Sequence, residues 1–144
     1  MGETEIRYLE SIDGITAAQL TGGFFVGWPD PPNPETHLRL LAGSDHIVLA
    51  VDSETNHVIG FITAITDGVL SAYIPLLEVL PAYQHRGIGQ ELMQKMLDRL
   101  RHLYMVDLLC DQELQPFYEQ LGMQPAMGML IRNYDRQSGK RAWH

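Results

Sequence analysis

The sequence has little cysteine and no long apolar run, and each shortage excludes a class of protein. Cys110 is the only cysteine in 144 residues, so an internal disulfide framework and a cysteine-rich zinc site are excluded. No apolar run approaches the roughly 18–20 residues that a membrane-spanning helix needs. The charged N-terminus lacks the apolar core of a secretory signal, so we expect a cytoplasmic protein.

Positive charge is also scarce. The chain has 10 Lys and Arg residues against 18 Asp and Glu, which gives a net charge of −8. Binding to a nucleic-acid backbone needs a basic face, so we expect no nucleic-acid partner. The six histidines lack the spacing of metal ligands, so we expect no metal site.

The composition and length are typical of one globular domain. Hydrophobic residues make up 45% of the chain and charged residues 19%. The length suits a single domain covering 1–144, with the polar segment 135–144 as a loose tail.

The periodicity of apolar residues, together with Gly and Pro, predicts the elements. In chain order they are a strand at 6–12, helices at 16–25 and 35–41, strands at 46–51, 58–65 and 69–80, a helix at 87–103, a strand at 105–110, a helix at 115–121 and a strand at 126–134. This order predicts an α/β chain of the α+β type with a mixed central sheet. Pro75 cannot donate a ladder hydrogen bond, so the fourth strand is either bulged there or lies at an edge.

The loop between the fourth strand and the long helix favours an anion. Gly87 and Gly89 stand where the helix begins, and free N–H groups at a helix N-terminus attract phosphate. Arg86 adds a guanidinium that suits phosphate geometry. A dinucleotide fingerprint is missing, because Leu92 stands where its third glycine belongs, and no Gly-Lys-Ser/Thr run follows. The sequence therefore predicts a phosphate or pyrophosphate ligand.

The wider pattern resembles a known signature. Gln84-x-x-Gly87-x-Gly89, preceded by Val79-x-Pro81, resembles the acetyl-CoA signature of the GNAT (Gcn5-related) N-acetyltransferases. The segment 116–123 is similar to that family's later helix motif, FY-x-x-x-GF, with methionine replacing the final aromatic residue. The element order matches from about residue 6 to 134, and the resemblance implies a GNAT-like sheet with a bulged fourth strand.

The resemblance also implies where acetyl-CoA binds. The backbone groups of Leu77 and Val79 would contact the pantetheine arm. The residues that would surround the pyrophosphate are Gln84, His85, Arg86, Gly87, Ile88, Gly89 and Gln90. Asp111 stands where relatives commonly have an asparagine that contacts the cofactor arm. An ionised aspartate only accepts hydrogen bonds, so Asp111 either makes a different contact or caps the following helix.

The transfer of an acetyl group to an amine needs a base, an oxyanion donor and an acid for the leaving thiolate. By resemblance, the Val79 N–H is the oxyanion donor and Tyr118 the acid, with core packing as the alternative for Tyr118. Glu78 is the candidate base, and the alternatives are a water molecule as the base and a structural or solvent-facing role for Glu78. Alternation along a strand places Glu78 and Val79 on opposite faces unless the bulge changes the register.

The acceptor pocket is expected at Phe24, Trp28 and Tyr73, with packing of the proline-rich loop as the alternative for Trp28. The resulting hypothesis is an N-acetyltransferase that acts on a primary amine of a small molecule or peptide, in a ternary complex. The alternative is a non-catalytic acyl-CoA-binding module on the same fold. The last expected strand offers an edge for a homodimer.

Overall fold

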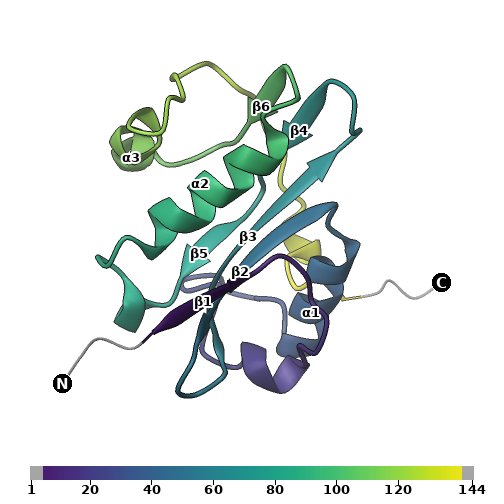
Figure 1. Cartoon of the computed structure of the whole chain (residues 1–144). Coiled ribbons are helices and arrows are strands. Elements are labelled where there is room, and N and C mark those ends of the chain that lie inside the picture. The colour runs from purple at the N-terminus through teal and green to yellow at the C-terminus, as the bar shows by residue number, and fades with distance from the viewer. Residues whose placement is uncertain (1–4, 141–144) are drawn as a thin grey trace.

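The computed structural model describes residues 5–140 as a twisted sheet with helices on both faces (Figure 1). The strands are β1 (Ile6–Leu9), β2 (His46–Asp52), β3 (Val58–Thr66), β4 (Ser71–Tyr73), β5 (Leu77–Val79) and β6 (Met105–Asp107). The α-helices are α1 (Pro34–Gly43), α2 (Ile88–Leu100) and α3 (Gln115–Glu119). Short 3₁₀ helices are η1 (Ala17–Leu20), η2 (Pro81–Tyr83), η3 (Gln112–Leu114) and η4 (Tyr134–Arg136).

The sheet runs in the order β1-β2-β3-β4-β6, and β5 also pairs with β3. The pairs are antiparallel except for β4 with β6, which is parallel and needs the α2 crossover. Successive residues of a strand face opposite sides, and β3 shows which helix covers each side. The Phe61 ring meets His37 of α1, whereas Gly60 lies against Leu92 of α2. This arrangement confirms the expected α+β fold with a mixed sheet.

Coverage of both faces explains why β2 and β3 are almost continuously apolar and buried. The long helix was expected at 87–103, and α2 covers most of that range, from Ile88 to Leu100. Its buried stripe consists of Ile88, Leu92, Met93, Met96 and Leu100. Helix α1 begins as the sequence predicts, because Pro34 occupies its first turn and the Asn33 side chain accepts the Thr36 N–H at 2.8 Å.

The expected fourth strand, 69–80, is broken at Pro75. Its halves are β4 and β5, and both pair with β3. The β4 register would place Leu76 opposite Ile62, but Leu77 takes that position, so one extra residue is inserted between the halves. This insertion is the bulge that Pro75 indicated. It lets β5 separate from the β4–β6 pair and opens the sheet at this point.

Two expected elements are wrong. The segment expected as a strand at 126–134 forms none in the structure, and the side chains of Met127, Met129 and Ile131 stand 103%, 98% and 82% exposed. Without that strand, the expected dimer edge has no counterpart in the structure. The expected helix at 16–25 shortens to η1, because the chain turns at Gly23 (φ 98°) and Phe25 (φ 65°).

The C-terminal part of the described chain returns to the α1 side. The Gln137 side chain accepts the Asp30 N–H at 2.8 Å, and the Arg39 guanidinium donates to the Gly139 carbonyl. Ser138 is buried. Residues 137–139 of the expected tail are therefore held against the rest of the protein, and 141–144 lie outside the described residues.

A buried histidine sits in the layer between α1 and the sheet. The His37 side chain is 1% exposed, and its ring lies 4.5 Å from Phe61, 5.0 Å from Phe25 and 5.2 Å from Phe24. Its Nε2 has no hydrogen-bond partner. Burial among these rings disfavours the charged imidazolium and lowers the pKa of His37 to about 4.

We expect His37 to make the protein acid-sensitive. Between pH 6.5 and about 4 the unfolded chain binds a proton on this side chain that the folded chain does not, so the free energy of unfolding falls as the pH falls. The loss between pH 7 and pH 4.5 should be about 2 kcal/mol. Urea denaturation of wild type and His37→Phe at both pH values measures it, with His102→Phe as the exposed control. An equal loss in wild type and His37→Phe would contradict the assignment.

Candidate active site

The loop before α2 presents free backbone donors. Gly87 caps the helix in the left-handed conformation (φ 80°), and Glu91 is the first residue whose N–H bonds within it, to the Gly87 carbonyl at 3.0 Å. The N–H groups of Ile88, Gly89 and Gln90 therefore have no acceptor within the helix. A Cβ at Gly87 would meet nothing within 4 Å, so the space beside Gly87 at the start of the helix is open. This geometry suits an anion at the positive end of the helix dipole.

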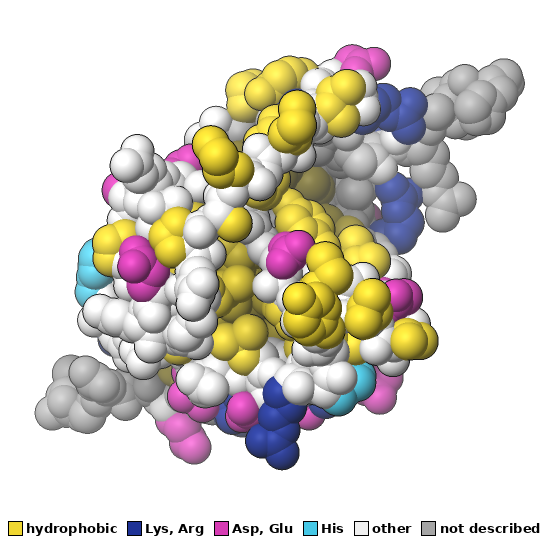
Figure 2. All heavy atoms as spheres, turned by 90° about the horizontal axis from the view of Figure 1, so that it is seen from above, with side chains coloured by type: hydrophobic (Ala, Val, Ile, Leu, Met, Phe, Trp, Pro, Cys, Tyr) yellow, Lys and Arg dark blue, Asp and Glu magenta, His cyan; other side chains and the backbone are white. Residues whose placement is uncertain are grey.

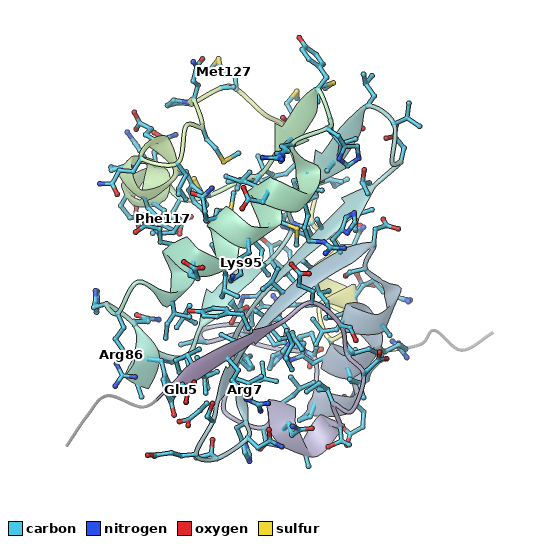
Figure 3. All side chains as sticks on the ribbon, in the orientation of Figure 1. Glu5, Arg7, Arg86, Lys95, Phe117 and Met127 are labelled. Atoms are coloured by element: carbon cyan, nitrogen blue, oxygen red, sulfur yellow. The ribbon has the colours of Figure 1, made fainter. Side chains whose placement is uncertain are left out.

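Arg86 is exposed beside these donors. Its guanidinium lies 5.4 Å from the centre of the Tyr83 ring, and it points outward at the N-terminal end of α2 (Figure 3). The Tyr83 hydroxyl donates to Asp52, at the end of β2. This hydrogen bond is the main cause that lowers the pKa of Asp52 and raises that of Tyr83. The pair ties the loop to the sheet, and neither residue was expected in the site.

The open edge of β5 supplies further backbone groups. The Leu80 N–H bonds the Ile59 carbonyl of β3 at 2.8 Å, and in an antiparallel ladder every second residue bonds the same neighbour. Leu77 and Val79 therefore turn their N–H groups away from β3, toward the opening beyond the bulge. The Gln84 side chain donates to the Val79 carbonyl at 2.9 Å, which joins the loop to this edge.

A cavity of about 430 Å³ lies beside this edge. It brings together residues that are far apart in sequence and that include Trp28, Leu77, Glu78, Asp111 and Tyr118. Hydrophobic side chains gather on the face of the molecule seen from above and line a hollow in it (Figure 2). Within the cavity, Glu78 provides a carboxylate and Tyr118 a phenol, both half-buried.

The Glu78 carboxylate has one firm partner. The Phe25 N–H donates to its Oε1 at 2.8 Å. Burial raises the pKa of Glu78, and the hydrogen bond from Phe25 partly opposes that rise. Val79 faces the other side of β5, because a Cβ on Gly89 would lie 3.8 Å from its Cγ2. Alternation therefore holds at this point, and the bulge at Pro75 leaves Glu78 and Val79 on opposite faces.

Tyr118 is placed by α3, which begins with Pro116 in its first turn. The Phe117 ring packs edge-on against Tyr118, 5.0 Å between centres, and lies on the α2 side of α3 (Figure 3). Burial is the main cause that raises the pKa of Tyr118, and Cys110 in the same cavity adds to it. The phenol therefore keeps its proton at neutral pH.

Comparison with known families decides the identity. Residues 15–123, well over half of the chain, match the sequence model of the acetyltransferase (GNAT) family. The chain belongs to the GNAT acetyltransferase family. The resemblance seen at the Gln84–Gly89 loop and at 116–123 is thereby confirmed.

Three similar proteins support the GNAT assignment. A putative acetyltransferase from Deinococcus radiodurans R1 is 48% identical, with a TM-score of 0.90 over 95% of this chain and 94% of that one. A GNAT family protein, SP0256 from Streptococcus pneumoniae, is 28% identical, with a TM-score of 0.70 over 91% and 98%. The histone acetyltransferase TAP1 from Glycine max is 29% identical over 69% of this chain. This chain spans about half of TAP1, 47% of its length.

Within this GNAT fold, the expected acceptor residues separate. Trp28 lines the cavity that holds Glu78, and its ring centre lies 4.9 Å from that of Phe25. Phe24 is buried in the aromatic cluster with His37 and does not line the cavity. Tyr73 is exposed and lines a different cavity, of about 740 Å³, formed with the segment 121–132.

Asp111 was expected either to contact the cofactor arm differently or to cap the following helix. It lines the cavity with Glu78, but its side chain makes no capping hydrogen bond to η3, so the expected helix cap is wrong. Phe25 was also a candidate for the acceptor pocket, but it bonds Glu78 and does not line the cavity. Sequence reasoning missed that contact, and it missed Arg132, which lines the cavity. Nothing local in the sequence signals either feature, because the fold brings these residues in from distant segments.

Residues 5–140 contain no group of three His, Cys, Asp or Glu side chains placed to hold a metal ion. In the same range, no helix has the length and apolar character needed to cross a bilayer.

Proposed function

We propose that this GNAT protein transfers the acetyl group of acetyl-CoA to a primary amine of a small molecule or peptide. The observation that carries the proposal is the cavity that joins Glu78 and Tyr118 beside the open edge of β5. A base, an acid and free strand donors then lie around one space. Each is a group that acyl transfer to an amine requires.

The residues present fit acetyl-CoA as the donor substrate. The N–H groups of Ile88, Gly89 and Gln90, with the Arg86 guanidinium, would hold the pyrophosphate. Gly87 leaves the approach open, since it has no side chain in front of these donors. The Leu77 N–H, on the open edge of β5 beside Val79, would bond the pantetheine arm, as an added strand would.

The catalytic roles follow from the same geometry. Glu78 removes a proton from the ammonium group, because only the neutral amine attacks the thioester carbon. The Val79 N–H stabilises the negative charge that develops on the carbonyl oxygen. As the new C–N bond forms and the C–S bond breaks, Tyr118 gives its proton to the leaving thiolate. The acylated nitrogen then loses its second proton, which restores the Tyr118 phenol. Raised pKa values at Glu78 and Tyr118 suit a base that works near neutral pH and an acid that stays protonated.

The charges around the cavity favour an amine as the acceptor. Of the three charged residues that line it, Glu78 and Asp111 are acidic and Arg132 is basic, and the chain carries a net charge of −8. This field favours the approach of an ammonium ion. Trp28 would pack on the apolar part of the acceptor.

Titration calorimetry and a thiol-release assay test the proposal together. Acetyl-CoA should bind saturably, whereas NAD and ATP at the same concentrations should not. Release of free CoA over a panel of primary amines should then exceed the rate without amine. Binding without turnover on any amine would favour the acyl-CoA-binding module instead, and no binding at millimolar acetyl-CoA would overturn the donor assignment.

A further inference from the structure

Phe25 has a backbone conformation that its side chain disfavours. Only three non-glycine residues among 5–140 have positive φ, namely Phe25 (65°), Asn56 (62°) and His85 (65°). Asn and His tolerate the left-handed region comparatively well, whereas a bulky residue such as Phe is a genuine outlier there. Such an outlier persists only where the surroundings enforce it.

The surroundings of Phe25 are an aromatic cluster. Its ring centre lies 4.9 Å from Trp28, 5.0 Å from His37 and 6.1 Å from Phe61, and the side chain is 3% exposed. The Trp28 N–H also bonds the Phe25 carbonyl at 3.1 Å. With the ring held from three sides, the backbone cannot relax without breaking these contacts.

The result of this conformation is a fixed donor for the Glu78 carboxylate. The Phe25 N–H meets Oε1 at 2.8 Å, across 53 positions of sequence. Phe61 of β3 links the two: it is paired with Glu78 across the sheet, and its ring packs against that of Phe25. The carboxylate and its donor are thus placed by one cluster.

We propose that Phe25 is a positioning residue for the proposed acetyl transfer: the aromatic cluster holds its backbone left-handed so that its N–H fixes the Glu78 carboxylate in the cavity. The inference rests on the proposed role of Glu78 as base. The positioning role explains the strained backbone of Phe25, because a base must be held in one orientation toward the amine.

The other titratable groups near Glu78 come from several elements. The cavity also contains Asp111, Tyr118, Cys110 and Arg132, and His37 lies behind Phe25 in the cluster. The two influences on the pKa of Glu78 are burial, which raises it, and the Phe25 N–H, which lowers it. Loss of that N–H contact should therefore raise the pKa of Glu78, and the base should need a higher pH to act.

Three variants separate positioning from packing. Phe25→Ala and Phe25→Gly lose the same ring, but glycine adopts positive φ at no cost and alanine does not. Phe24→Ala removes a neighbouring ring of the same cluster that does not bond Glu78. The readouts are the acidic limb of the kcat/KM profile and the titration of the Glu78 carboxyl by ¹³C NMR, assigned with Glu78→Gln.

We expect Phe25→Ala to move both midpoints to higher pH by about one unit, with a smaller shift in Phe25→Gly and none in Phe24→Ala. Equal shifts in all three variants, or none in Phe25→Ala, would overturn the proposal. The NMR titration needs no turnover, so failure of the positioning role is distinguished from failure of the proposed acetyl transfer, in which wild type releases no CoA with any amine.

Discussion

Replacement of Gly87 by glutamate should abolish acetyl-CoA binding. Gly87 precedes the free N–H groups of α2, and a carboxylate there would occupy the anion site and repel the pyrophosphate. We expect the dissociation constant to rise at least ~100-fold, a change that a few kcal/mol of lost and repulsive contacts produce. Titration calorimetry of wild type and Gly87→Glu measures it.

Gly68→Glu is the matched control. Gly68 (φ 76°) and Gly87 (φ 80°) share the left-handed conformation, and a Cβ would meet nothing within 4 Å at either position. Both variants should lose about 1–2 kcal/mol of stability from backbone strain. Only Gly87→Glu should lose acetyl-CoA. If both variants bind equally, the α2 loop does not hold the pyrophosphate.

Tyr118→Phe should lower kcat about 100-fold, because loss of a general acid typically costs 10²–10⁴ in rate. The phenyl ring keeps the packing against Phe117, and only the hydroxyl of this cavity-lining residue is lost. Acetyl-CoA affinity should therefore be unchanged. The measurement pairs steady-state rates with calorimetry on the same protein.

Tyr134→Phe is the control for both measurements, since Tyr134 is exposed and does not line the cavity. It should leave both kcat and the dissociation constant at their wild-type values. A Tyr118→Phe enzyme that turns over at the wild-type rate would remove Tyr118 from the mechanism. A parallel loss of acetyl-CoA affinity would instead place it among the binding contacts.

Local sequence was enough for the features that depend on near neighbours. The amphipathic stripe of α2 follows from side-chain spacing, and its start from Gly87, because helix periodicity and caps act over a few residues. Pro75 likewise marked the break in the fourth strand, since a missing N–H interrupts a ladder wherever it falls. The loop from Gln84 to Gly89, which resembles the family's acetyl-CoA signature, was recognisable because its residues are adjacent in sequence.

The segment 126–134 shows where such reasoning fails. Its apolar residues predict a strand, yet Met127 points outward from the loop beyond α3 (Figure 3), and no ladder forms. A strand needs a partner at the right edge, and apolar character alone does not provide one. Whether such a segment pairs is therefore a property of the whole fold.

The sequence by itself determined the family, the order of the main elements and the loop suited to pyrophosphate. Only the tertiary structure decided that Trp28 belongs to the cavity and Phe24 to the core, and that Phe25 holds Glu78. Strand alternation predicts on which face of the sheet Glu78 lies, but not which residues pack over that face. The Phe25 N–H that bonds Glu78 comes from a loop 53 residues away, and the packing of aromatic rings from three segments sets the conformation of that loop.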